Sequence, residues 1–207
     1  MSIDLLRIEV QGLCNYTIGY THVGLSFENP ASIVDNNILI FDGLREDDKI
    51  QAEAHELAHL YFKTVGLIYL NPQFGDECDF FVLELNNAIS HKYVIEKLSE
   101  LNISNDYHLS LRNNSLNNIA VDINNCRYSP ALLRGLGLRI FDVFQTVREP
   151  IVNINECASQ NEIVLQAYNT AQQNISLITP QQTREEQVAL VSSFLRELGY
   201  RPDGFFR

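Results

Sequence analysis

The sequence lacks the features that mark membrane and secreted proteins. It contains no apolar run of about eighteen residues, so we expect no membrane-spanning helix. The segment Met1–Leu13 lacks the basic stretch and the long apolar stretch of a signal peptide. The four cysteines are scattered without a Cys-x-x-Cys pair, which argues against a disulfide framework and favours a reducing compartment. We therefore predict a cytoplasmic protein that has no membrane partner.

Basic residues are also scarce. The chain has 15 Lys and Arg residues against 26 Asp and Glu residues, which gives a net charge of −11 at pH 7. Nucleic-acid binding needs a basic surface to neutralise phosphates, so we expect no direct binding of nucleic acid. The sequence also has no internal repeat, no phosphate-binding glycine loop and no nucleophile motif. The acidic charge fits a protein partner that carries positive charge.

The length and the hydrophobic content favour an ordinary packed core with an α+β fold. The chain has 207 residues, of which 45% are hydrophobic. Alternating or β-branched runs predict strands in three N-terminal segments, namely Leu6–Val10, Tyr16–Phe27 and Asn37–Phe41. A turn is expected at Asp35 and Asn36, because these residue types favour turns. We expect a small N-terminal sheet followed by a mainly helical C-terminal part.

Composition suggests three regions. Residues 1–101 are expected to form the core that carries the sheet and the functional site. Residues 102–128 are rich in Asn and Ser, which predicts a loop or linker. Residues 129–207 are expected to form a helical extension that packs on the core.

Three helices are expected in the C-terminal extension. The first begins with Ser129 as the capping residue and Pro130 at the first helical position. The second is expected over Glu156–Asn174. The third follows a predicted capping box at Thr179–Gln182 and ends at Gly199. Their apolar faces are typical of core helices rather than of a cofactor site.

The five residues His55-Glu56-Leu57-Ala58-His59 predict a metal-binding helix. Side chains four residues apart on a helix project from one face, so both imidazoles can reach one Zn²⁺. Glu56 then lies beside the metal, where its carboxylate can accept a proton from the attacking water. The surrounding segment Leu44–Gly66 has apolar residues at helical spacing, acidic residues at its start and a glycine at its end. We therefore predict a helix over this segment.

A catalytic zinc takes three protein ligands and leaves one position for water. The next predicted helix, Asp79–Leu101, places the ionisable side chains of Glu84 and His91 on or beside an apolar face. They are seven residues apart, about 10 Å along the axis, so a single zinc does not readily bind both. We predict Glu84 as the third ligand and His91 as a catalytic residue that contacts the substrate oxyanion or orients a ligand. The alternatives are His91 as the third ligand, or one of the acidic residues Asp76, Glu77 and Asp79.

Two further features concern the substrate. Tyr107 and His108, in the Asn-rich region, are candidate donors to a tetrahedral intermediate above the metal. The predicted strand Asn37–Phe41, just before the motif helix, is a candidate exposed edge on which an extended peptide can pair. The alternative for this strand is an interior position without substrate contact.

These segments resemble the ImmA/IrrE-type bacterial metallopeptidases. The resemblance covers the run from about Asn37 to Leu98, in which a strand and turn (NNILIFDGL) precede the motif helix (DDKIQAEAHELAHLYF) and a later helix carries ELNNAISH. In that family the later helix brings an acidic ligand close to an Ala-Asn pair. Glu84 matches the acid, and Asn87-Ala88 matches the pair in reverse order. The resemblance implies a zincin-like domain, a Zn²⁺ cofactor, protein substrates and a regulatory role such as cleavage of a repressor or activation of a defence or stress response.

Two functions are consistent with these observations. The leading prediction is a zinc-dependent endopeptidase that cleaves a specific intracellular protein, such as a regulator, a repressor or a defence-type partner, with Glu56 as the general base. The alternative is a non-catalytic metal-binding module for protein interaction, in which the metal holds two helices together. Replacement of Glu56 by Gln separates the two, because only the enzyme needs this carboxylate.

Overall fold

The computed structural model describes residues 3–24, 30–71, 75 and 77–206, and its contacts divide the chain into two compact units. The first unit consists of Met1–Val65 and Tyr93–Leu111, and the second consists of Gly66–Lys92 and Arg112–Arg207. These units do not follow the expected boundaries at residues 101 and 128. Two helices, α3 (Glu77–Glu100) and α4 (Asp106–Asn114), contribute residues to both units.

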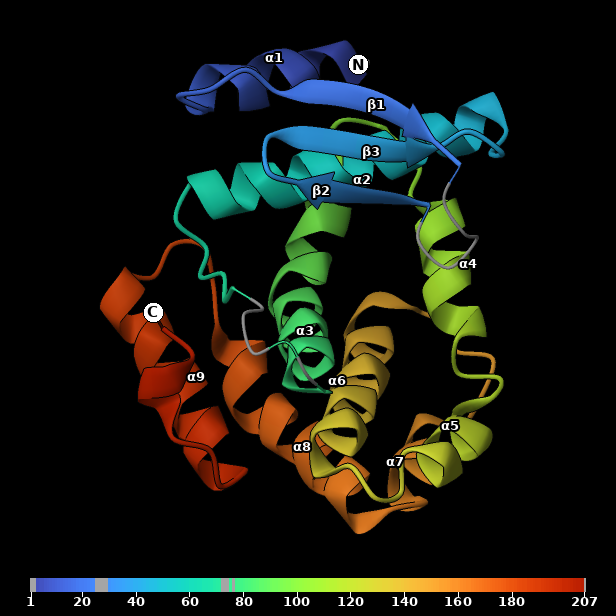
Figure 1. The fold of residues 1–207 in the computed structure, drawn as a ribbon, viewed down its shortest axis with the longest axis vertical. Coiled ribbons are helices and arrows are strands. Elements are labelled where there is room, and N and C mark those ends of the chain that lie inside the picture. Colours follow the sequence, from blue (N-terminus) through green and yellow to red (C-terminus); the bar gives the residue numbers. More distant parts are fainter. Residues whose placement is uncertain (1–2, 25–29, 72–74, 76, 207) are drawn as a thin grey trace. The chain divides into compact units, whose positions relative to one another are not determined.

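The first unit holds a three-stranded sheet. Its described elements are α1 (Ile3–Leu13), β1 (Gly19–Val23), β2 (Ala31–Val34), β3 (Asn37–Phe41) and α2 (Glu46–Thr64). The strand order is β1-β3-β2, with β1 parallel and β2 antiparallel to β3 (Figure 1). The expected turn at Asp35 and Asn36 is confirmed, because these residues connect β2 to β3 and Asp35 has a φ of 54°. Together with the helices, this small mixed sheet near the N-terminus confirms the α+β fold class.

The strand Asn37–Phe41 is not a free edge, and the prediction that it offers one was wrong. Strand β3 pairs through Ile38 with Tyr20 on one side and with Ile33 on the other. Ile38 and Ile40 are buried in the core of the first unit, so the alternation along the strand reflects a covered face. An alternating pattern does not distinguish a central strand from an edge strand, because both have one buried face. The outer strands of the described sheet are β1 and β2.

The predicted strand Leu6–Val10 is part of helix α1 instead. Leu6 and Val10 are fully buried, whereas the side chain of Ile8 between them is 69% exposed. Buried positions four residues apart have the spacing of a helix, and the exposed β-branched residue made the short run resemble a strand.

Helix α2 confirms the predicted helix over Leu44–Gly66. Acidic residues fill its first turn and Lys63 lies in its last turn, which complements the helix dipole. The chain leaves the helix through Gly66, whose φ of 103° is accessible mainly to glycine. Ala54, Leu57 and Ala58 are buried, and α2 packs against α1 and β3. This packing turns one defined face of the motif helix inward.

All regular secondary structure among the described residues of the second unit is helical. Besides its part of α3, its elements are α5 (Ile119–Asn125), α6 (Pro130–Thr146), α7 (Ile154–Ser159), α8 (Glu162–Asn174), the 3₁₀ turn η1 (Ile175–Leu177), α9 (Arg184–Glu197) and the 3₁₀ turn η2 (Pro202–Gly204). The predicted start of α6 is confirmed, since the Ser129 side chain accepts a hydrogen bond from the backbone N–H of Leu132. None of the described helices is long and apolar enough to cross a membrane.

Three expectations for this part of the chain were wrong. Residues 102–128 contain helices α4 and α5 rather than a loop, because short helices with many Asn residues give a weak periodic pattern. The single helix expected over Glu156–Asn174 is two helices, because Asn161 caps a second one. The capping box is formed by Thr183 and Glu186, four residues later than expected.

Candidate metal centre

The two motif histidines face each other across one turn of α2. Their Nε2 atoms are 3.0 Å apart, their ring centroids are 4.7 Å apart, and the ring planes meet at 74°. Two imidazole nitrogens bound to one tetrahedral zinc lie about 3.3 Å apart, so this separation fits a shared ion. His55 is buried and His59 is half-buried. The helical spacing therefore places the two imidazoles as the motif predicts.

Asn105 fixes the orientation of His55. The Nδ1 atom of His55 lies 3.3 Å from the Oδ1 atom of Asn105, just before α4. An amide oxygen accepts hydrogen bonds, so this contact favours the tautomer with the proton on Nδ1 and the lone pair on Nε2. Metal-binding histidines usually donate their other ring N–H to such an oxygen. No sequence pattern singles out Asn105, because it lies among many other Asn and Ser residues.

His91 belongs to the second unit and His108 to the first. His91 is on α3, two residues before Tyr93, where the chain enters the first unit on the same helix. His108 belongs to the region that was expected to be a loop. It lies in helix α4, and its ring stacks on that of His55.

Ring orientation distinguishes the candidate ligands. The rings of His55 and His108 are stacked, with centroids 3.6 Å apart and planes at 22°. An imidazole binds a metal through a lone pair in its own plane, so two nearly parallel stacked rings direct their lone pairs past each other. The rings of His55 and His59 are close to perpendicular and converge at their Nε2 atoms. The geometry favours His59 over His108 as the partner of His55.

Glu56 lies between the two motif histidines in the sequence. Its side chain is half-buried, and burial raises the pKa of its carboxyl group to about 7. A carboxyl group with this pKa both accepts and donates a proton near neutral pH.

Glu84, the predicted third ligand, is held by two arginines. Its Oε2 atom accepts a hydrogen bond from Arg112 at 2.9 Å, and its Oε1 atom accepts one from Arg139 at 2.7 Å. Burial alone would raise the pKa of Glu84, but the positive charges of Arg112 and Arg139 outweigh it and lower the pKa. Among the described residues, Glu84 belongs to no group of side chains with metal-binding geometry.

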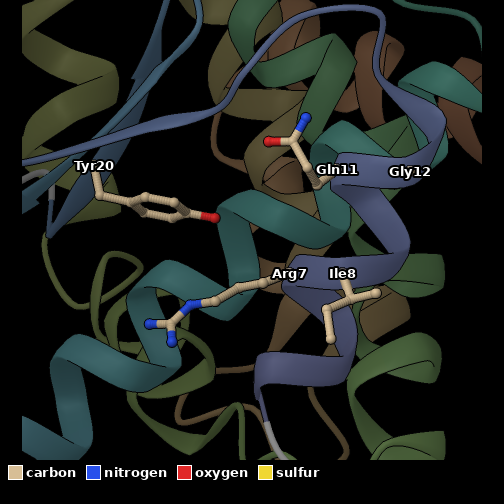
Figure 2. Close-up of a pocket in the computed structure, with 5 residues that line it drawn as sticks. All are labelled: Arg7, Ile8, Gln11, Gly12 and Tyr20. Carbon is tan, nitrogen blue, oxygen red and sulfur yellow. The ribbon is translucent and has the colours of Figure 1, made fainter.

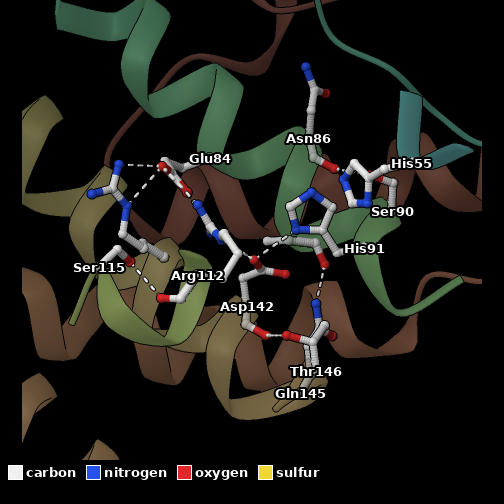
Figure 3. Close-up of polar contacts among 12 residues, drawn as sticks. His55, Glu84, Asn86, Ser90, His91, Arg112, Ser115, Asp142, Gln145 and Thr146 are labelled. Carbon is white, nitrogen blue, oxygen red and sulfur yellow. Dashed lines mark hydrogen bonds and ion pairs between the residues drawn. The ribbon is translucent and has the colours of Figure 1, made fainter. Parts of the chain in front are cut away.

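His91, the predicted catalytic residue, contacts Asp142 of helix α6. Its Nδ1 atom is 2.8 Å from the Oδ2 atom of Asp142, and both side chains are almost fully buried (Figure 3). The same Oδ2 atom accepts a hydrogen bond from Arg112. Asp142 and Arg112 were not singled out from the sequence. An Asp inside an otherwise apolar helical face at position 142 was the one available signal.

Asn86 and two of the acidic candidate ligands, Glu77 and Asp79, make structural contacts. The Asn86 side chain pairs with the backbone N–H and C=O of Leu70, which ties α3 to the preceding segment. The carboxylate of Glu77 contacts the Ser129 hydroxyl, and that of Asp79 accepts a hydrogen bond from the backbone of Gly75. Asp76 lies outside the described residues.

A shallow groove of about 480 Å³ lies in the first unit (Figure 2). It is lined by Arg7, Ile8, Gln11, Gly12 and Tyr20. The Arg7 guanidinium lies beside the Tyr20 ring and is bound by the carboxylate of Glu53 at 2.6 Å. The lining has no nucleophile and no group of metal ligands, so the histidines remain the better candidate site.

No family model matches the sequence, and no curated protein and no solved structure matches it either.

Proposed function

We propose that the protein is a zinc-dependent endopeptidase of the ImmA/IrrE-like type, with His55 and His59 as metal ligands. The observation that supports this most strongly is the convergence of the His55 and His59 Nε2 atoms at 3.0 Å on the helix that also carries Glu56. Glu84, the third ligand expected from the sequence, is bound by two arginines instead. A catalytic zinc keeps one of its positions for water or substrate.

The residues divide the chemistry between them. A zinc ion held by these imidazoles supplies a Lewis acid that polarises the scissile carbonyl group and makes water more acidic. Glu56 takes the proton of the attacking water and then delivers it to the leaving amine. His108, which stacks on His55, would donate a hydrogen bond to the oxyanion of the tetrahedral intermediate. The substrate class is a protein of the same cell, cleaved for regulation.

The metal site is tested by metal analysis of the purified protein. We expect one zinc per chain in the wild type, and at least a tenfold weaker zinc affinity in His55→Ala and in His59→Ala. His22→Ala is the matched control, because His22 is an exposed histidine that contacts Asp42. Equal zinc affinity in all three variants and the wild type would show that the motif does not bind zinc.

Catalysis is tested with Glu56→Gln. This variant should keep its zinc and lose cleavage by at least about 100-fold, because a general base contributes roughly 10²–10⁴-fold to the rate. The readout is the appearance of new protein N-termini when the protein is added to an extract of its own host cells. Glu46→Gln, at the exposed start of the same helix, should cleave like the wild type. New termini that form equally with Glu56→Gln would exclude Glu56 as the base.

The position of His108 supports a second candidate function. If His108, which stacks on His55, also binds the metal and closes the site, the metal has only a structural role, as in a non-catalytic interaction module. A closed site requires that His108→Ala weakens zinc binding as strongly as His59→Ala does. The peptidase requires that His108→Ala keeps its zinc and loses activity only.

A further inference from the structure

Strand β1 is an outer strand of the described sheet, and one row of its backbone groups faces away from β3. The N–H of Gly19 and the C=O of Val23 form hydrogen bonds with residues at the two ends of β3. Successive residues of a strand direct their backbone groups to opposite sides, so those of Tyr20 and His22 point outward. Among the described residues, no backbone hydrogen bond reaches these outward groups. They are therefore available to pair with an added strand.

The 480 Å³ groove of the first unit adjoins this strand. Its lining comes from helix α1, except for Tyr20 of β1 (Figure 2). Ile8 and Tyr20 are 69% and 41% exposed, so the groove presents apolar side chains to its contents. A Cβ atom on Gly12 would meet nothing within 4 Å, which shows that the groove has room at this point. An edge strand beside a groove on a helix is an arrangement that binds extended peptides, because the strand supplies backbone hydrogen bonds and the groove takes alternate side chains.

The charges around the groove favour a basic partner. The Arg7 guanidinium, which lines the groove, is bound by Glu53 at 2.6 and 2.7 Å and by Asp4 at 2.8 Å. Two carboxylates thus share one positive charge. In the whole first unit, Asp and Glu residues outnumber Lys and Arg residues by more than two to one. This charge attracts a basic segment and repels an acidic one, including a second copy of the same chain.

We propose that the outer edge of β1 and the groove on α1 bind an extended segment of a partner protein that has a net positive charge and directs apolar side chains toward α1. The backbone of the segment pairs with Tyr20 and His22, and its apolar side chains contact Ile8 and fill the space beside Gly12. This surface is separate from the proposed metal centre, because none of these residues belongs to the histidine motif.

The binding surface is tested with two blocked peptides of about eight residues, the length of an ordinary strand. One alternates Lys and Val, and its matched control alternates Glu and Val. Each is titrated into the ¹⁵N-labelled protein, and amide shifts and hydrogen exchange are recorded. We expect the Lys-Val peptide to bind at least about tenfold more tightly, because like charges repel the other. It should protect the amides of Tyr20 and His22 from exchange, whereas the amide of Gly19, which is already bonded, should change little.

Two variants separate the contribution of the strand edge from that of the groove. His22→Pro removes an outward N–H, and an edge strand tolerates proline at such a position. It should weaken binding of the Lys-Val peptide about three- to tenfold, as expected for one lost hydrogen bond, whereas His22→Ala keeps the N–H and should bind like the wild type. Ile8→Lys should weaken binding at least about tenfold, because it removes an apolar contact and adds a repelling charge. Val121→Lys is its control, since Val121 is an exposed apolar residue of α5 in the second unit.

Three results would overturn the inference. The first is equal affinity for the two peptides, or no binding of either at millimolar concentration. The second is binding that protects other amides but not those of Tyr20 and His22, which needs no variant to detect. The third is protection of these two amides without peptide that rises with protein concentration, because a second copy of the chain then occupies the edge. None of these results depends on zinc, so the failure of this inference is distinguishable from the failure of the proposed function.

Discussion

Two buried histidines are each oriented by one oxygen atom. The Nδ1 atom of His55 faces the Asn105 amide, and that of His91 faces the Asp142 carboxylate. Each contact leaves the Nε2 lone pair for another partner. The neutral amide and the charged carboxylate differ in strength, because hydrogen bonds to ionised groups are about twice as strong. The orientation of His91 is therefore expected to be the firmer of the two.

Replacement of Asn105 tests this point at a single residue. We expect Asn105→Ala to weaken zinc binding about tenfold, because the His55 ring loses the oxygen that fixes its tautomer. The measurement is zinc affinity, determined by competition with a chelator. Asn117→Ala is the control, because Asn117 is exposed in the same Asn-rich region. Equal affinities in the two variants would show that Asn105 does not orient His55.

Close contact between helices α6 and α8 requires a glycine. A Cβ atom on Gly137 would lie 2.5 Å from the carbonyl oxygen of Val164 and 2.8 Å from the Ala167 side chain. Atoms at such distances overlap, so any larger residue pushes the helices apart. Position 137 is thus the point where the two helices pack backbone against backbone.

Gly137→Ala should therefore destabilise the protein, although alanine is the better helix former. We expect a net loss of about 1–2 kcal/mol from overpacking, which lowers the melting temperature by about 2–8 °C. Calorimetry measures this shift. Gly12→Ala in α1 is the control, since a Cβ atom there meets nothing within 4 Å. A melting temperature for Gly137→Ala at or above that of Gly12→Ala would contradict the packing.

The elements themselves could be predicted to different degrees. Helices α2, α3, α6 and α9 have long amphipathic patterns or clear end signals, and the sequence located them. The N-terminal segment Leu6–Val10 and the region 102–128 are short or weakly periodic, and both were assigned wrongly. In such segments tertiary contacts outweigh local preference.

At the scale of the whole molecule, the buried ion pairs make stability depend on pH. The charges of Arg112 and Arg139 hold the pKa of Glu84 below its unfolded value of about 4.3, even though burial alone would raise it. A carboxyl group with a lowered folded pKa contributes stability that is fully present above the unfolded pKa. This contribution is lost as the pH falls through the folded pKa.

Glu84→Gln should therefore lower the free energy of unfolding by about 3–5 kcal/mol at pH 7, because two guanidinium groups, whose side chains are only 12% and 22% exposed, lose their buried carboxylate partner. The difference from the wild type should shrink as the pH falls below about 4. Urea unfolding of the zinc-free proteins between pH 3 and pH 7 measures both effects. Glu46→Gln, at an exposed ion pair, should differ by no more than about 1 kcal/mol. If Glu84→Gln instead keeps its stability but loses its zinc, Glu84 is a metal ligand.

The sequence by itself determined the α+β class, the motif helix and the convergence of His55 and His59, because helical spacing fixes which side chains share a face. The partners of Glu84 and His91 depended on the tertiary structure. Only the fold brings Arg112 and Arg139 to Glu84, and Asp142 to His91, from positions 28 to 55 residues away in the chain. Local patterns carry no information about such distant partners, and the partners decide whether a buried carboxylate pairs with arginines or is available to bind a metal.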